Sequence, residues 1–135
     1  MNVLSAETVQ ALFVKLGLPF TFTSEELAQY STTNIVDVPG RVLAFPTPLR
    51  NQGLNIIRLR ELLGVDPKHP PSFFDHPWYL DETFARTDCS AGWHVIHMEV
   101  LEDSLYQPYN YHHSLESRGL TLPTAIEVVL MLFLQ

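Results

Sequence analysis

The sequence predicts an α+β domain with a small, mostly antiparallel sheet, two to four helices and an apolar C-terminal helix. Three observations predict this class: segments with capped helical periodicity, a segment with two-residue alternation, and a last segment that is apolar on every side. A chain of 135 residues has the length of one ordinary domain. Its 46% hydrophobic residues argue against disorder, which combines few apolar residues with high charge.

Two helices are expected near the N-terminus. Ser5 can cap the first, and Gly17 followed by Pro19 ends it. The run Thr23-Ser24-Glu25-Glu26 matches a capping box, in which the threonine hydroxyl and the last glutamate satisfy each other's backbone N–H groups. A short second helix should follow this box.

The next segment should be extended. Residues 35–38 and 41–45 are rich in β-forming side chains and flank Pro39-Gly40, a turn pair. This arrangement predicts a hairpin. Pro46 and Pro48 should end it, because proline cannot donate to a strand ladder.

A third helix is predicted after Asn55, which can cap it, and Gly64 should close it. Beyond it, residues 66–77 contain four prolines and several aromatic side chains. Aromatic side chains are costly to leave in water, so we expect an ordered loop there. A short helical turn should follow over residues 81–86.

The clearest strand prediction covers residues 93–101. Alternation places His94, Ile96 and Met98 on one face and Trp93 and Val95 on the other. Because both faces are largely apolar, we expect an inner strand of the sheet.

The C-terminal segment predicts a buried helix. Pro123 suits an early helical position, and Thr124 with Glu127 matches a second capping box. From Val128 onward every side is apolar, which is typical of a buried helix. We expect one domain over residues 1–135, with the alternative that it is the N-terminal part of a longer protein truncated within this helix.

The net charge and the number of cysteines limit the classes of protein to which the chain can belong. The 15 acidic and 8 basic residues give a net charge of −7, which argues against nucleic acid as a partner. The single cysteine, Cys89, excludes an intrachain disulfide and favours a reducing compartment. No secretory-signal layout and no apolar run of about 18 residues occurs. We therefore expect a soluble, cytoplasmic protein that does not bind membranes.

The sequence assigns no catalytic residue and no cofactor. It contains no nucleophile elbow, glycine-rich phosphate loop or dinucleotide fingerprint. Cys89 follows Asp88, whose negative charge opposes formation of a thiolate. We interpret this cysteine as a free thiol without a catalytic role.

One alternative is a small metal-dependent or hydrolytic enzyme. On a strand, His97 and Glu99 share a face, and a loop could bring His112 or His113 to them. These four residues are the candidate metal ligands.

Another alternative is binding of an anion or small ligand near Arg50. The start of the helix capped by Asn55 presents free N–H groups beside this arginine. Side chains from the same helix and from two aromatic loops complete the candidate ligand-binding set: Arg50, Arg58, Trp78, Tyr79 and Tyr109.

The preferred function is a non-catalytic structural or protein-interaction module. Residues 73–79 and 106–111 are dense in side chains that are enriched at interfaces, although such loops also form satellite cores. We expect a protein partner or self-association through these two aromatic loops and the apolar C-terminal segment.

Overall fold

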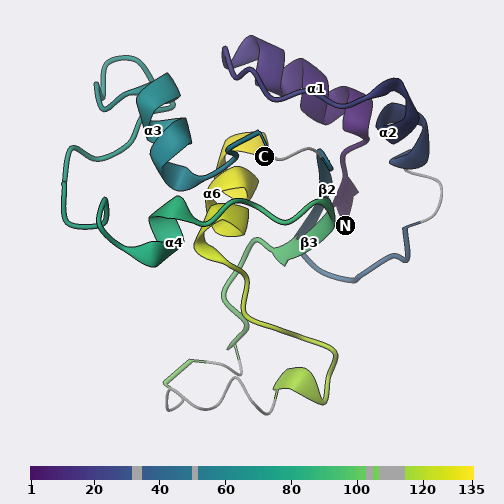
Figure 1. Cartoon of the computed structure of the whole chain (residues 1–135). Helices are drawn as coiled ribbons and strands as arrows, with labels where there is room; N and C mark the ends of the chain where they lie inside the picture. The colour runs from purple at the N-terminus through teal and green to yellow at the C-terminus, as the bar shows by residue number, and fades with distance from the viewer. Residues whose placement is uncertain (32–34, 50–51, 103–104, 107–114) are drawn as a thin grey trace.

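The computed structural model describes residues 1–31, 35–49, 52–102, 105–106 and 115–135, and the structural statements below concern these residues. They form a three-stranded sheet in the order β1-β2-β3 and five helices (Figure 1). The predicted α+β class is confirmed. The elements are β1 (Asn2–Val3), α1 (Ala6–Lys15), α2 (Ser24–Gln29), β2 (Val42–Thr47), α3 (Ile56–Leu63), α4 (Thr83–Arg86), β3 (Gly92–His97) and α6 (Ala125–Leu134).

The central strand β2 pairs differently on its two sides. It is antiparallel to β3, with Leu43 opposite Ile96, and parallel to the short β1. The sheet is therefore mixed rather than purely antiparallel. Two hydrogen bonds at its margins show which backbone groups of β2 face which neighbouring strand. The Leu4 N–H donates to the Ala44 carbonyl (2.8 Å), and the Met98 N–H donates to the Arg41 carbonyl (2.8 Å). In β2 the odd-numbered residues bond to β3 and the even-numbered ones face β1.

Four expectations about this sheet are wrong. Residues 35–38 are not a strand, so no hairpin forms, and β2 runs through Pro46 to Thr47. Pro46 is tolerated because its missing N–H would face the β1 side, where pairing has already ended at Val3. The strand predicted over residues 93–101 is shorter, and β3 lies at an edge of the sheet rather than inside it.

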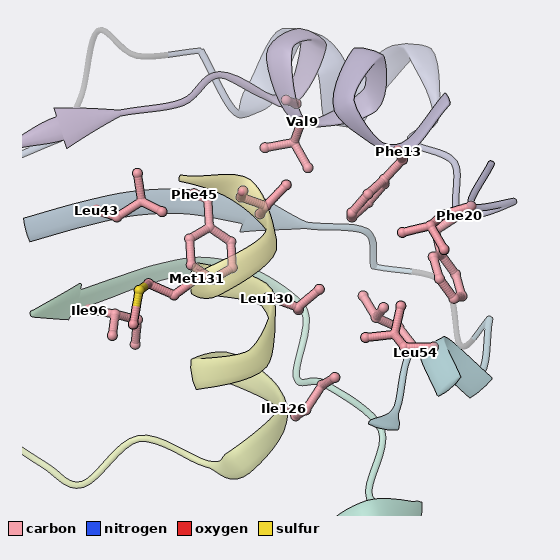
Figure 2. Close-up of a cluster of buried hydrophobic side chains, with 14 of the residues drawn as sticks. Val9, Phe13, Phe20, Leu43, Phe45, Leu54, Ile96, Ile126, Leu130 and Met131 are labelled. Atoms are coloured by element: carbon pink, nitrogen blue, oxygen red, sulfur yellow. The ribbon is translucent and has the colours of Figure 1, made fainter. Parts of the chain in front are cut away.

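One hydrophobic core joins the sheet to the helices. Figure 2 shows side chains of α1 and α6 meeting the side chains that project from β2 and β3. Because opposite positions in an antiparallel pair share a face, Leu43, Phe45 and Ile96 lie together on this core side. The labelled core residues are Val9, Phe13, Phe20, Leu43, Phe45, Leu54, Ile96, Ile126, Leu130 and Met131.

The predicted helix starts are confirmed by their caps. The side chains of Ser5 and Asn55 accept hydrogen bonds from N–H groups three residues further on. At α2 both halves of the capping box are present: the Thr23 N–H donates to Glu26 Oε1 (2.9 Å) and the Glu26 N–H to Thr23 Oγ1 (3.1 Å). Each such cap contributes about 1 kcal/mol, so local sequence fixes where these helices begin.

The chain itself covers the apolar C-terminal helix. The inner residues of α6 are buried in the core, while Leu132 is its exposed large apolar residue. The prediction of a buried helix is therefore confirmed, and little of its apolar surface is left for a partner. Of the helices in the described ranges, none combines the length and the apolar character that a bilayer crossing requires.

Candidate functional site

Three aromatic side chains lie exposed on the segment that follows α3 and includes α4. Phe74, Trp78 and Phe84 are 83%, 68% and 39% exposed, and we call them the aromatic surface. Figure 1 shows this stretch as an outer loop on the side of the molecule that carries α3 and α4. Isolated exposed apolar residues are ordinary, but several aromatic rings close together mark a binding surface.

Buried contacts hold this loop in place. The Phe73 N–H donates to the Gly64 carbonyl (2.9 Å), and the Phe73 ring packs against Phe133 of α6 with centroids 5.6 Å apart. Phe73 therefore points into the molecule while its neighbour Phe74 points out. Because Phe73 is held by these contacts, the aromatic surface lies on an anchored segment rather than on a free loop.

The exposed rings also contact one another. Trp78 lies 6.3 Å from Phe84 and 5.7 Å from Tyr79, both in edge-to-face geometry. Such pairs add about 0.5–1.5 kcal/mol beyond area burial. The rings thus support one another's orientation while leaving most of the Trp78 indole accessible.

Arg60 of α3 links the aromatic loop to the helix. Its guanidinium lies 5.7 Å from the centroid of the Tyr79 ring, and its Nη2 is 3.0 Å from Asp75 Oδ1. A cation over a ring is held by the ring's quadrupole, and the contact is stronger where water is excluded, as around this half-buried side chain.

A cavity of about 460 Å³ opens beside this arginine. Its walls are apolar with a charged rim: Ile57, Arg60, Glu61, Gly64, Val65, Leu80, Asp81 and Arg86. The rim charges are partly paired with each other, since Arg86 Nη2 is 3.5 Å from Asp81 Oδ1. This arrangement can accept an apolar side chain and surround it with polar contacts.

A second group of functional side chains surrounds His94, which is 5% exposed. His94 Nδ1 lies 2.8 Å from Glu127 Oε1, and Nε2 lies 2.9 Å from both the Ser90 carbonyl oxygen and Thr47 Oγ1. Cys89 Sγ is 3.7 Å from the same Nε2. The five residues come from β2, the loop before β3, β3 itself and α6.

The two ring nitrogens of His94 have different partners. The Glu127 carboxylate only accepts hydrogen bonds, so Nδ1 donates to it, whereas Nε2 faces the Ser90 carbonyl and the Thr47 hydroxyl, which can donate or accept. The contact between the ring and Glu127 is shielded from solvent, with the His94 side chain 3% exposed. Burial raises the pKa of Glu127, but hydrogen bonds from Thr124 and from His94 outweigh it, and the net pKa lies below its usual value.

Cys89 lies in line with this pair, in the order expected of a nucleophile, a base and an orienting carboxylate. Burial raises the pKa of its thiol to about 12, so the thiol is protonated at neutral pH. A protonated thiol is a poor nucleophile, so the role that the geometry supports for the cluster is to join β3 to α6 through the contact between His94 and Glu127.

Sequence reasoning missed this cluster because its members are far apart in the chain. Two signals were present: His94 shares the apolar face of β3 with Ile96, and Glu127 belongs to the predicted capping box. The Glu127 half of that box is present, with the Thr124 N–H donating to Oε2 (2.6 Å). A polar side chain on a core face needs a partner, but nothing local identifies which one.

The structure does not bring the predicted metal ligands together in the part of the chain that it describes. Glu99 Oε1 is 2.9 Å from Arg41 Nη1 in an exposed ion pair, and His97 ends β3. His112 and His113 lie outside the described residues. Within those residues, no three histidine, cysteine or acidic side chains are grouped so that they could hold a metal ion.

The structure brings only some of the predicted ligand-binding residues together within the part of the chain that it describes. Trp78 and Tyr79 are in ring contact, whereas Arg58 is exposed and pairs with Glu61 on its own helix (3.4 Å). Arg50 and Tyr109 lie outside the described residues. The arginine that approaches the aromatic loop is Arg60, two positions after Arg58.

Comparisons of the chain with protein-family models, with curated proteins and with solved structures gave no match.

Proposed function

We propose that this protein is a non-catalytic protein-interaction module that binds a partner protein through its aromatic surface. The observation that carries the proposal is the exposure of Phe74, Trp78 and Phe84 on a segment anchored from below by Phe73. Tryptophan, tyrosine and arginine supply most of the binding energy at protein interfaces. All three residue types meet here, in Trp78, Tyr79 and Arg60.

The energetics favour a macromolecular partner. Covering one large apolar side chain stabilises a complex by about 1.5–3 kcal/mol. The aromatic surface has three such side chains. Trp78 is ordered before binding by its ring contacts with Tyr79 and Phe84, and Phe74 stacks on His76 with centroids 6.0 Å apart. Preordered side chains lose little conformational freedom on association, so more of this gain remains as affinity.

The adjoining cavity specifies the chemistry of the partner. Its apolar walls at Ile57, Val65 and Leu80 suit a protruding aliphatic or aromatic side chain of the partner. The charges of Glu61 and Arg86 at the rim suit polar groups around that anchor. We infer a protein partner that inserts one apolar anchor into the cavity while covering the Trp78 indole.

Site-specific photo-crosslinking in cells of the source organism tests this proposal. Replacing Phe84 by p-benzoylphenylalanine keeps an aromatic ring at the surface and adds a reactive ketone. The matched control places the same amino acid at Val14, an exposed position on α1. We expect a specific adduct from Phe84 and none from Val14.

The adduct supports the proposal only if the captured protein, once purified, binds the wild-type chain and loses affinity with Trp78→Ala. Equal labelling from both positions would show a non-specific contact. Absence of a specific adduct from Phe84 would contradict the proposal. An affinity for the captured protein that Trp78→Ala leaves unchanged would also contradict it.

The two alternative functions stay predictions. A metal-dependent enzyme requires His112 or His113 beside His97, and an anion site requires Arg50, none of which is settled by the described residues. Metal analysis of the purified protein tests the first, and thermal stabilisation by phosphate beyond a general salt effect tests the second. Of the second aromatic loop the structure describes Tyr106, which is fully exposed.

A further inference from the structure

Within the described part of the chain, strand β3 has one edge that faces no other strand. The Met98 N–H donates to the Arg41 carbonyl, so the even-numbered residues of β3 direct their backbone groups at β2. The backbone N–H and C=O groups of Trp93, Val95 and His97 therefore point away from β2. Among the described residues, none of these groups makes a hydrogen bond that would close this edge.

This edge lacks the features that prevent strand pairing. Natural edge strands are protected by lysine, proline, bulges or inward charges. The residues of β3, Gly-Trp-His-Val-Ile-His, include no lysine, no proline and no acidic side chain, and their register with β2 is continuous from Gly92 to His97. At the centre of the strand Val95 is 44% exposed.

We propose that this edge pairs with β3 of a second copy of the chain, antiparallel and around a twofold axis at Val95. In that register Val95 lies opposite the partner's Val95, and Trp93 lies opposite the partner's His97. All three outward-facing residues then occupy hydrogen-bonded positions on both strands. The two three-stranded sheets become one continuous sheet.

The sequence of β3 fits its own copy. In the antiparallel register the Trp93 ring of each copy faces the His97 imidazole of the other, one pair on each side of the central Val95 pair. Such cross-strand pairs stabilise sheets. The nearest acidic residue, Glu99, would lie opposite the partner's Ala91, so no like charges face each other. A second copy therefore satisfies the open backbone groups and also matches the side chains.

This interface is separate from the proposed aromatic surface. The aromatic surface lies on the segment that follows α3 and includes α4, whereas the open edge belongs to the sheet (Figure 1). Variants at Val95 should therefore leave the surface around Trp78 unchanged. The two proposals can fail independently.

Sedimentation velocity and light scattering of the wild-type chain from low to high micromolar concentration test the pairing. We expect a reversible dimer of twice the 15.4 kDa chain mass. Val95→Lys and Val95→Glu each place like charges in contact across the axis, and each should weaken dimerisation about tenfold or more. Val95→Thr is the matched control, because threonine is β-branched and uncharged, and it should stay dimeric.

Mixing the lysine and glutamate variants in equal amounts tests the register. Opposite charges would then meet at the axis, so we expect dimers to return, which also shows that both variants are folded. Wild-type protein that remains monomeric throughout would overturn the proposal. A dimer that survives Val95→Lys, or that is lost on Trp78→Ala, would place the interface elsewhere, and a mixture that stays monomeric would contradict the twofold pairing at Val95.

Discussion

His94 of β3 and Glu127 of α6 are joined by a 2.8 Å contact between Nδ1 and Oε1, and this contact attaches the C-terminal helix to the sheet. Glu127 also accepts the Thr124 N–H, so one carboxylate caps α6 and accepts a hydrogen bond from the buried His94 ring. The helix therefore reaches the core through a specific polar contact as well as through its apolar side chains.

Replacing Glu127 by glutamine should lower the free energy of unfolding by about 2 kcal/mol. A hydrogen bond to a charged group contributes about 1.5–3 kcal/mol, and the carboxylate of Glu127 accepts such a bond from His94 while it is 18% exposed. Urea denaturation measures the change. Glu82→Gln is the control, because Glu82 is exposed and its side chain makes no capping hydrogen bond; an equal loss in both variants would show that the pair with His94 is not the cause.

The same carboxylate should make stability depend on acidity. Hydrogen bonds hold the pKa of Glu127 below its usual value of 4.5, so its contribution is complete above that value and is lost as the pH falls through the lower folded-state pKa. The stability curve of Glu127→Gln should be flatter in this acidic range.

Glu82→Gln provides the control for this pH dependence, because Glu82 is exposed and its side chain makes no capping hydrogen bond. The Lys68 N–H and the His69 side chain also lower the pKa of Asp66, so Asp66→Asn should flatten the curve as well. Unfolding curves of Glu82→Gln measured over the same pH range should keep the wild-type slope. Equal flattening in Glu127→Gln and Glu82→Gln would contradict the role given to Glu127.

Cys89 should react slowly with iodoacetamide in the folded protein. Burial raises the pKa of its thiol to about 12, and only the thiolate attacks the reagent. Mass spectrometry should show an alkylation rate that still rises at strongly alkaline pH, and fast labelling in urea. Rapid labelling of the folded chain at neutral pH would mean that His94 holds a thiolate, and it would restore a nucleophilic role for this residue.

The sequence predicted what depends on neighbouring residues. Ser5, Thr23 and Asn55 cap helices as expected, because capping depends on residues within one turn. The alternation around His94 and Ile96 placed these two residues on one face of β3, and in the structure both are buried on that face.

What remained hidden depends on contacts between distant segments. Alternation reports which faces of a strand are covered but not which strands flank it, so β3 was expected inside the sheet. The two-residue strand β1 is too short to leave a pattern. His94 and Glu127 are separated by 33 positions, and only the folded chain brings them together.

The proposed function also rests on a distinction that the sequence could not make. Phe73 and Phe74 are adjacent and identical in type, yet one is packed against Phe133 and the other is exposed. The composition of residues 73–79 is compatible both with a buried core segment and with an exposed interface. The structure separates the anchoring ring from the presented one.

The most direct test of the interaction proposal is the affinity of the crosslinked partner for Trp78→Ala, measured by calorimetry beside Val14→Ala. Removing a central aromatic anchor from an interface costs about 2 kcal/mol or more, a factor of about 30 in the dissociation constant. We predict such a loss for Trp78→Ala and unchanged binding for Val14→Ala. Wild-type affinity in Trp78→Ala would contradict the claim that the aromatic surface is where this protein binds.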